Sequence, residues 1–247
     1  MAKSATHNSP VAGLRKALTA VLASVVLLAA CRPTEPPPPT AREILERSAQ
    51  SMQALESTHF VLDRTGAPAY VDPTNTFVFK RAEGDVKTPD QARAKVRVIA
   101  PGFVAEVSLV ILGEDWYQTN PLTQEWGRYS AQGYNPALFF DPEKGLGAVM
   151  QNSLTNLSLA GTEELDDFPG VRLYHLTAEA PGEPVSAMTA GMMGRGRVVF
   201  DLWVRPDDYY VARVRAIEPE TDAEDPTVWV MDLDKYNAPV SIEAPIQ

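Results

Sequence analysis

The sequence feature that most constrains the fold is a change in hydrophobic period near residue 57. Residues 40–56 repeat apolar side chains at helical spacing, whereas most later segments alternate apolar and polar residues, as "AKVRVIA" (94–100) does. Short turns join these alternating segments, so successive strands are expected to pair as hairpins. The sequence therefore predicts an α+β fold with a largely antiparallel sheet and helices against one face.

Two helices are predicted to accompany the sheet. The first begins at a capping box formed by Thr40 and Glu43 and continues to about Glu56. The second lies in residues 139–154, where Asp141 is the expected N-cap and a proline follows it. Its apolar stripe is expected to consist of Leu146, Val149 and Met150.

The N-terminal segment predicts export. Residues 1–16 are polar and contain three basic residues, and residues 17–30 are apolar and uncharged. This apolar run is shorter than the roughly 20 residues of a permanent membrane span, so residues 1–30 are interpreted as a signal peptide. Residues 28–31, Leu-Ala-Ala-Cys, resemble a bacterial lipobox. The resemblance implies that Cys31 is acylated and becomes the new N-terminus.

Cys31 is the only cysteine, so it has no partner for an internal disulfide and is a poor metal ligand. The stretch after it, residues 31–40, is rich in proline and suits an extended spacer between a membrane and a domain. We therefore interpret Cys31 as a tether, and residues 41–247 as one domain. The alternative is an ordinary signal peptide with a chance cysteine.

Charge and motif content argue against several classes of function. The formal net charge of −10 disfavours binding to nucleic acid. No histidine has a second histidine three or four residues away, and no phosphate loop, dinucleotide fingerprint or nucleophile elbow is present. His175 is interpreted as a hydrogen-bonded strand residue. The sequence thus predicts no catalytic residue, no metal, no cofactor and no enzyme activity.

Five stretches, in order, resemble the LppX/LprA/LprF/LprG lipoproteins of actinobacteria. They are "ILERSAQSMQALESTHFVLDRTG", "GEDWYQTNPLTQEWGRY", "DDFPGVRLYHLTAEA", "VVFDLWVRPDDYYVARVR" and "LDKYNAPVSIEAP". The resemblance implies a LolA/LolB-like fold, in which a strongly curved antiparallel sheet, or half-barrel, is closed by helices around an apolar cavity. It also implies that the protein binds an acylated lipid or lipoglycan and carries it across the cell envelope.

Alternation and helical spacing select candidate residues for the apolar wall of this cavity. These are Phe77, Phe79, Phe103, Val107, Leu109, Ile111, Trp116, Leu146, Val149 and Met150. For each of them, plain core packing is the alternative role. The Met-rich residues 181–197 are either a disordered hairpin tip or a gate over the cavity.

Two other functions remain open at this point. One is an envelope sensor or assembly lipoprotein that uses the same fold to bind a protein partner, and the other is a structural lipoprotein with a filled core. For the favoured carrier, the expected location is the extracytoplasmic face of the cell membrane, held by acylated Cys31, and an envelope transporter is a possible partner.

Overall fold

A computed structural model describes residue 1 and residues 37–72, 74–130, 135–194 and 196–246. The predicted signal peptide, apart from Met1, and Cys31 lie outside these residues. The chain divides into two compact units, Met1–Pro38 and Pro39–Gln247, and the second is described below. Within the described ranges, no helix combines the length and the apolar character of a membrane span.

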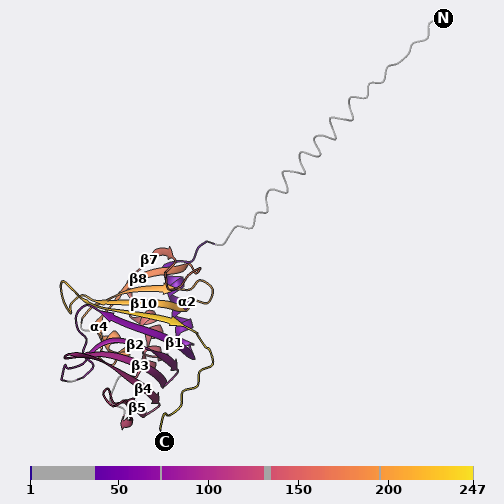
Figure 1. Ribbon diagram of the computed structural model, residues 1–247. Helices are drawn as coiled ribbons and strands as arrows, with labels where there is room; N and C mark the ends of the chain where they lie inside the picture. Colours follow the sequence, from indigo (N-terminus) through magenta and orange to yellow (C-terminus); the bar gives the residue numbers. More distant parts are fainter. Residues whose placement is uncertain (2–36, 73, 131–134, 195, 247) are drawn as a thin grey trace. The chain divides into compact units, whose positions relative to one another are not determined.

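The described part of the second unit forms one 11-stranded antiparallel sheet and several helices (Figure 1). The strands are β1 (Ser57–Thr65), β2 (Val78–Lys87), β3 (Gln91–Ala100), β4 (Phe103–Leu112), β5 (Asp115–Thr119), β6 (Trp126–Ser130), β7 (Thr155–Glu163), β8 (Leu173–Ala180), β9 (Val198–Val204), β10 (Val211–Glu218) and β11 (Thr227–Asp234). The helices are α2 (Ala41–Gln53), α3 (Leu146–Asn152), α4 (Gly182–Met188) and the 3₁₀ helix η1 (Pro136–Phe140).

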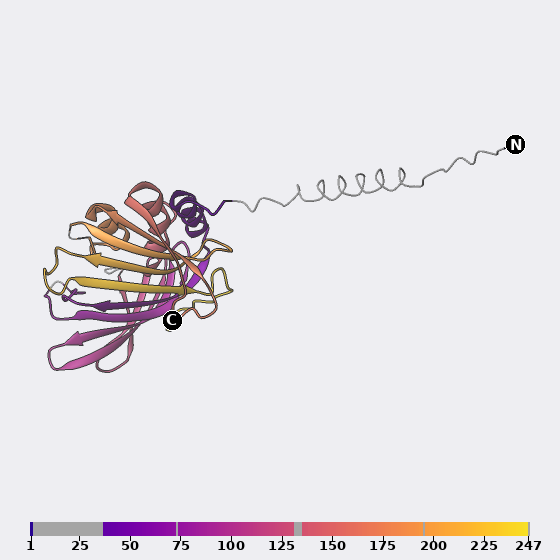
Figure 2. The same ribbon diagram turned by 90° about the horizontal axis from the view of Figure 1, so that it is seen from above.

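The strand order is β6-β5-β4-β3-β2-β1-β11-β10-β9-β8-β7. The first and last strands are therefore neighbours in the middle, and β6 and β7, which are consecutive in sequence, form the two edges. The chain between these edges contains η1 and α3. The sheet curves around its helices (Figure 2), which confirms the predicted fold of a curved antiparallel sheet with helices against one face.

The core lies between the sheet and these helices. Inward-facing residues alternate along the strands, as in β11, where Trp229, Met231 and Leu233 are buried and Val228 and Val230 are half-buried. The same cluster includes the buried face of α2 and the apolar residues of η1, α3 and α4. A second, smaller cluster on the outer face packs the C-terminal segment against β4 and β5.

The first helix begins as predicted. The side chain of Glu43 accepts the Thr40 N–H at 2.8 Å, and the Thr40 hydroxyl accepts the Glu43 N–H at 3.3 Å, which completes the capping box. The helix ends at Gln53, earlier than the predicted Glu56. It packs against α3, where a Cβ on Gly147 would lie 2.8 Å from the carbonyl oxygen of Ala49. Glycine therefore permits the close approach of the two helices.

The start of the second predicted helix is corrected by the structure. Asp141 is not its N-cap, because residues 136–140 form η1 and Asp141 ends it. The Asp141 carboxylate instead accepts the N–H groups of Glu143 and Lys144, which makes a turn, and α3 begins only at Leu146. A short side chain that bonds to its own downstream backbone favours a turn as readily as a helix cap. The predicted stripe of Leu146, Val149 and Met150 is buried.

Two further elements differ from the prediction. Strand β7 is absent from the predicted set, because only one edge of it is paired, its residues are mostly exposed, and its sequence alternates only briefly, at Leu157 and Leu159. The Met-rich residues 181–197 contain the helix α4 rather than only a hairpin tip. This helix lies at the end of the strands where β8 ends and β9 begins.

The loop between β1 and β2 is organised by one carboxylate. Asp72 accepts hydrogen bonds from the Thr74 hydroxyl and from the N–H groups of Phe77, Thr76 and Thr74. These bonds, that of the Thr74 side chain first, lower the pKa of Asp72 to about 2 from its usual 3.8.

Because the pKa of Asp72 is depressed, its stabilisation of the loop is complete above the unfolded value of about 3.9 and is lost as the pH falls through about 2. We expect a carbon-detected NMR titration to give Asp72 a pKa near 2, with the amides of residues 74–77 shifting in the same transition. The variant Asp72→Ala should lose that amide transition. An Asp72 that titrates near 3.8 would show that these hydrogen bonds do not form in solution.

Candidate functional site

An apolar cavity lies inside the sheet, next to α4. Its volume is about 20 Å³, which is little more than the space of one water molecule. The lining residues come from four strands, from η1 and from the segment that begins at the end of α4. They are Leu62, Phe139, Met188, Thr189, Met192, Met193, Phe200, Val214, Ala216, Trp229 and Met231.

Three methionines of residues 188–193 line the cavity. Met188 and Met193 are buried, and Met192 packs against the core while partly exposed. The Thr189 hydroxyl donates to the Val185 carbonyl oxygen at 2.8 Å and accepts the Met193 N–H at 3.0 Å, so it turns the chain back over the cavity. Positive φ angles at Ala190 (47°) and Gly191 (82°) form this turn.

A buried carboxylate connects this methionine segment to the cavity wall. Glu218 is 3% exposed and accepts the Gly194 N–H at 2.8 Å and the indole N–H of Trp229 at 2.9 Å. Trp229 in turn lies against Phe79, with ring centroids 5.3 Å apart. One acidic side chain therefore fixes both the position of the segment and the orientation of the largest aromatic residue in the wall.

Seven of the ten residues predicted for the wall meet in one core cluster. Phe79, Leu109, Ile111, Leu146, Val149 and Met150 are buried in it, and half-buried Trp116 packs against it. They adjoin the small cavity only indirectly, for example through the contact of Phe79 with Trp229. Their role in binding a lipid remains a prediction.

The other three predicted wall residues are not fully buried. Phe77 is half-buried in the loop before β2, and Val107 is half-buried in β4. Phe103 is 44% exposed, because β4 extends beyond the end of β5 at this point. Alternation assigned Phe103 to the inner side of β4 but carried no information about where the neighbouring strand stops.

Several lining residues are absent from the set predicted from the sequence. Trp229 and Met231 alternate in "TVWVMDLD" and Phe200 and Leu202 in "VVFDLWV", so the pattern that marks an inward face is present. What the sequence does not show is that residues 188–193, at the end of α4 and after it, pack against these strands. That packing selects them, rather than β4, as the wall of the cavity.

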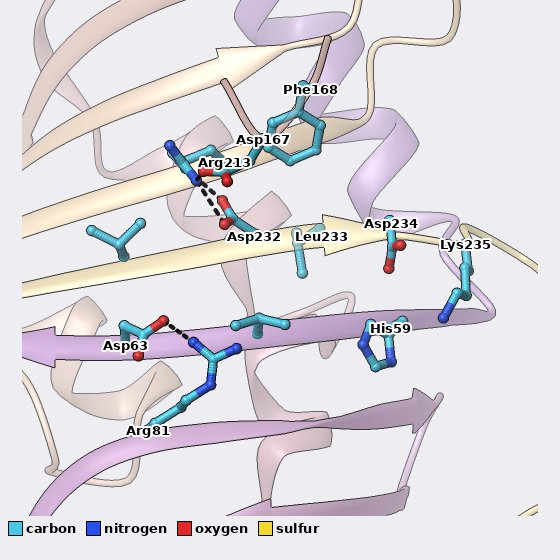
Figure 3. A pocket seen from close by; sticks show the side chains of 12 residues that line it. His59, Asp63, Arg81, Asp167, Phe168, Arg213, Asp232, Leu233, Asp234 and Lys235 are labelled. Atoms are coloured by element: carbon cyan, nitrogen blue, oxygen red, sulfur yellow. Dashed lines mark hydrogen bonds and ion pairs between the residues drawn. The ribbon is translucent and has the colours of Figure 1, made fainter. Parts of the chain in front are cut away.

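A larger groove of about 440 Å³ lies on the outer face of the sheet, over β1, β10 and β11 (Figure 3). Arg213 bonds both Asp232, at 2.7 Å, and Asp167 of the β7–β8 loop, and these carboxylates raise the pKa of Arg213. Arg81 pairs with Asp63 on the other side of the groove. A groove bordered by ion pairs offers no continuous apolar wall, so the smaller inner cavity is the better candidate for an apolar ligand.

The two histidines of the domain are structural. His175 has Nε2 at 2.8 Å from Asp201 and Nδ1 at 3.0 Å from Glu163, and its ring stacks on Trp203. His59 bonds Asp85 at 2.8 Å. This confirms the interpretation of His175 as a hydrogen-bonded strand residue. Among the residues with a described position, no three His, Cys, Asp or Glu side chains are arranged to hold a metal ion.

Comparison with known proteins identifies the family. A family model described as LppX_LprAFG lipoprotein matches residues 40–242. The chain belongs to this family. LprF of Mycobacterium tuberculosis, whose name refers to the transport of a diacylated glycolipid, is 25% identical over 179 residues, which cover 68% of this chain and 63% of LprF. The match to LprF thus spans less than two thirds of that protein.

Other members of the LppX_LprAFG family agree with this assignment. The lipoarabinomannan carrier protein LprG of Mycobacterium bovis is 24% identical over 195 residues, covering 76% of this chain and 78% of LprG. The crystal structure of LprF from Mycobacterium bovis has a TM-score of 0.64 at 19% identity, covering 84% of this chain and 97% of that one. LppX of Mycobacterium tuberculosis has a TM-score of 0.57 at 19% identity, with 82% and 98% covered. These structures share the fold of the present domain.

Proposed function

We propose that this protein is a membrane-anchored envelope lipoprotein that binds an acylated lipid or lipoglycan inside its curved sheet and carries it across the envelope. The observation that carries this proposal is the apolar cavity lined by methionines in a member of the LppX_LprAFG family. The names of LprF and LprG refer to a diacylated glycolipid and to lipoarabinomannan. Both are lipids with acyl chains and a carbohydrate head, and we extend that ligand class to this chain.

Acyl chains need an apolar wall, because each methylene exposed to water costs about 0.8 kcal/mol. The cavity of about 20 Å³ does not hold such a chain, so loading requires the wall to move. Met188, Met192 and Met193 are the side chains best suited to move, since methionine is unbranched and adapts to irregular spaces. As they withdraw, the space opens along Trp229 toward Phe79 and the core residues predicted from the sequence.

The anchor and the carrier act together in this proposal. Acylated Cys31 holds the domain at the extracytoplasmic face of the cell membrane, and the spacer lets it move relative to the bilayer. The chain needs no catalytic residue for this role, because transfer of a lipid makes and breaks no covalent bond. An envelope transporter that supplies or receives the lipid is a partner compatible with this function.

The direct test is to purify the full-length protein from its own membranes, extract it with organic solvent and identify the extract by mass spectrometry. We expect an acylated lipid or lipoglycan in near-stoichiometric amount. A lipid-free protein that co-purifies with one protein partner in fixed ratio would contradict the proposal and favour the sensor or assembly role.

A second measurement tests the methionines. Met193→Ala is expected to enlarge the cavity and to increase the rate at which lipid-stripped protein takes up lipid, while lowering the free energy of unfolding by about 2–5 kcal/mol. Met150→Ala is the matched control, because Met150 is also buried but does not line the cavity. If both variants take up lipid at the rate of the parent protein, the methionines do not limit loading.

A further inference from the structure

Exposed apolar side chains gather at one end of the strands. This end, called the mouth end below, is where β1 ends, β2 begins and α4 lies. The side chains come from the β1–β2 loop, the β3–β4 hairpin and the β5–β6 turn. We call them the apolar rim: Tyr70, Val71, Ile99, Phe103, Val104 and Leu122. They make up about half of the exposed large hydrophobic residues in the described part of the chain.

Strand register places part of the rim in one continuous row. Tyr70 forms a bridge with Val78, which pairs with Ile99, which pairs with Val104. Directly paired residues point to the same face and have neighbouring Cβ atoms, so these side chains form an apolar row across four segments. Tyr70, Ile99 and Val104 are 37%, 39% and 60% exposed. Phe103 and Leu122 extend the rim beyond this row.

A charged row begins immediately behind the apolar one. Arg81 pairs with Arg97, and Arg97 pairs with Glu106, on the same outer face and two residues inward from Ile99. Two residues of a strand correspond to about 7 Å. The outer face therefore changes from apolar to charged at a depth comparable with the roughly 5–10 Å to which interfacial segments enter a bilayer.

The rim shares its end of the domain with the way into the cavity. The methionine segment joins the mouth ends of β8 and β9, and the cavity residues Phe200, Ala216 and Trp229 belong to the mouth-end halves of their strands. A lipid that leaves the cavity past these methionines thus emerges at the end of the sheet that carries the rim.

We propose that the apolar rim inserts into the bilayer surface, so that lipid passes between the membrane and the cavity at the mouth end. This inference rests on the proposed carrier function. A spacer of about nine residues reaches roughly 30 Å at most, so the anchor keeps the domain close enough to the bilayer for weak docking to be effective. An anchor at one residue of the chain does not orient the domain relative to the bilayer, and the rim supplies this orientation.

The charges at the mouth end indicate that the rim docks on an electrically neutral bilayer surface. The rim itself contains no ionisable side chain other than the Tyr70 phenol. The β10–β11 loop at the same end contains four acidic residues, Glu220, Asp222, Glu224 and Asp225, all of them exposed, which repel anionic lipids. Docking is therefore driven by apolar burial on a neutral surface and is insensitive to added salt.

The test uses the whole chain with Cys31→Ser, which has no thiol, and phosphatidylcholine vesicles that carry a quencher below the headgroups. A fluorophore is attached through Val104→Cys in the rim or through Lys95→Cys, an exposed outward position of β3. We expect the label at position 104 to be quenched at both low and high salt, and the label at position 95 to be unaffected. Both proteins are made without export and so keep residues 1–30, and the difference between them therefore reports on the rim alone.

The second part of the experiment introduces a charge into the rim. Ile99→Asp, added to the chain labelled at position 104, is expected to lower the quenching about tenfold, because it places a carboxylate in the apolar row. Val171→Asp is the matched control, since Val171 is similarly exposed but lies in the β7–β8 loop. Equal quenching at positions 104 and 95, quenching unchanged by Ile99→Asp, or a dimer that Ile99→Asp dissociates would overturn the proposal. Rim quenching by a protein that yields no extracted lipid would refute the carrier function and leave the docking surface intact.

Discussion

Replacement of Cys31 by serine is expected to transfer the mature protein from the membrane fraction to the aqueous phase in a detergent partition. Cys31 is the residue to which the lipobox resemblance assigns acyl chains, and it is the only cysteine of the chain. Stable anchoring takes two or more such chains, because each buried methylene contributes about 0.8 kcal/mol. Without them, the docking proposed for the rim is too weak to retain the protein during fractionation.

The matched control for this experiment is Thr34→Ala, a change of similar size in the spacer that leaves the cysteine in place. It should remain in the detergent phase with the parent protein. Mass spectrometry of the mature N-terminus provides a second readout, since acylation adds a fixed mass to a chain beginning at Cys31. A Cys31→Ser protein that stays fully in the detergent phase would show that Cys31 does not anchor the protein.

Trp229→Ala is expected to be the most damaging single change in the folded domain. Trp229 is 2% exposed, contacts Phe79 and donates its indole N–H to Glu218. Truncation of such a side chain costs about 3–5 kcal/mol, and it leaves the buried Glu218 carboxylate without one of its donors. For a domain of this size, calorimetry should show a melting temperature lower by roughly 10 °C.

Two further variants separate the effect of lost packing from that of the lost hydrogen bond to Glu218. Trp229→Phe retains most of the packing and loses the indole N–H, so it should cost about 1–3 kcal/mol. Trp116→Ala removes an indole that is only partly buried, and a smaller loss than that of Trp229→Ala is expected. If Trp229→Ala melts like the parent, the wall of the cavity is more pliable than its burial indicates.

The sequence carries more information about the faces of strands than about their surroundings. Alternation correctly identified Leu109 and Ile111 as inward residues, and the capping box located the start of α2. Alternation is a local property, however, and the exposure of Phe103 depends on where β5 ends. The cavity depends on residues 188–193 packing against β9 and β11, and β11 is far from these residues in the chain.

Prediction from local sequence also failed where one residue type fits two kinds of structure. Asp141 followed by proline fits a helix start, yet its carboxylate closes a turn before α3. Strand β7 escaped detection because an exposed edge strand needs no apolar face, and two register irregularities interrupt its pairing with β8. In both places the structure is decided by hydrogen bonds to the backbone, and a hydrophobic pattern carries no information about these bonds.

The central pairing of β1 with β11 has a consequence for how the protein is made. The strands β1–β6 and β7–β11 each form by stacking neighbours in chain order, but the two stacks join only through the first and last strands. Until β11 has been synthesised, β1 therefore has one edge without a hydrogen-bonded partner. Closing so long a loop between the two strands is slow. An unpaired strand edge can pair with other chains, so the polypeptide is exposed to aggregation until β1 and β11 meet.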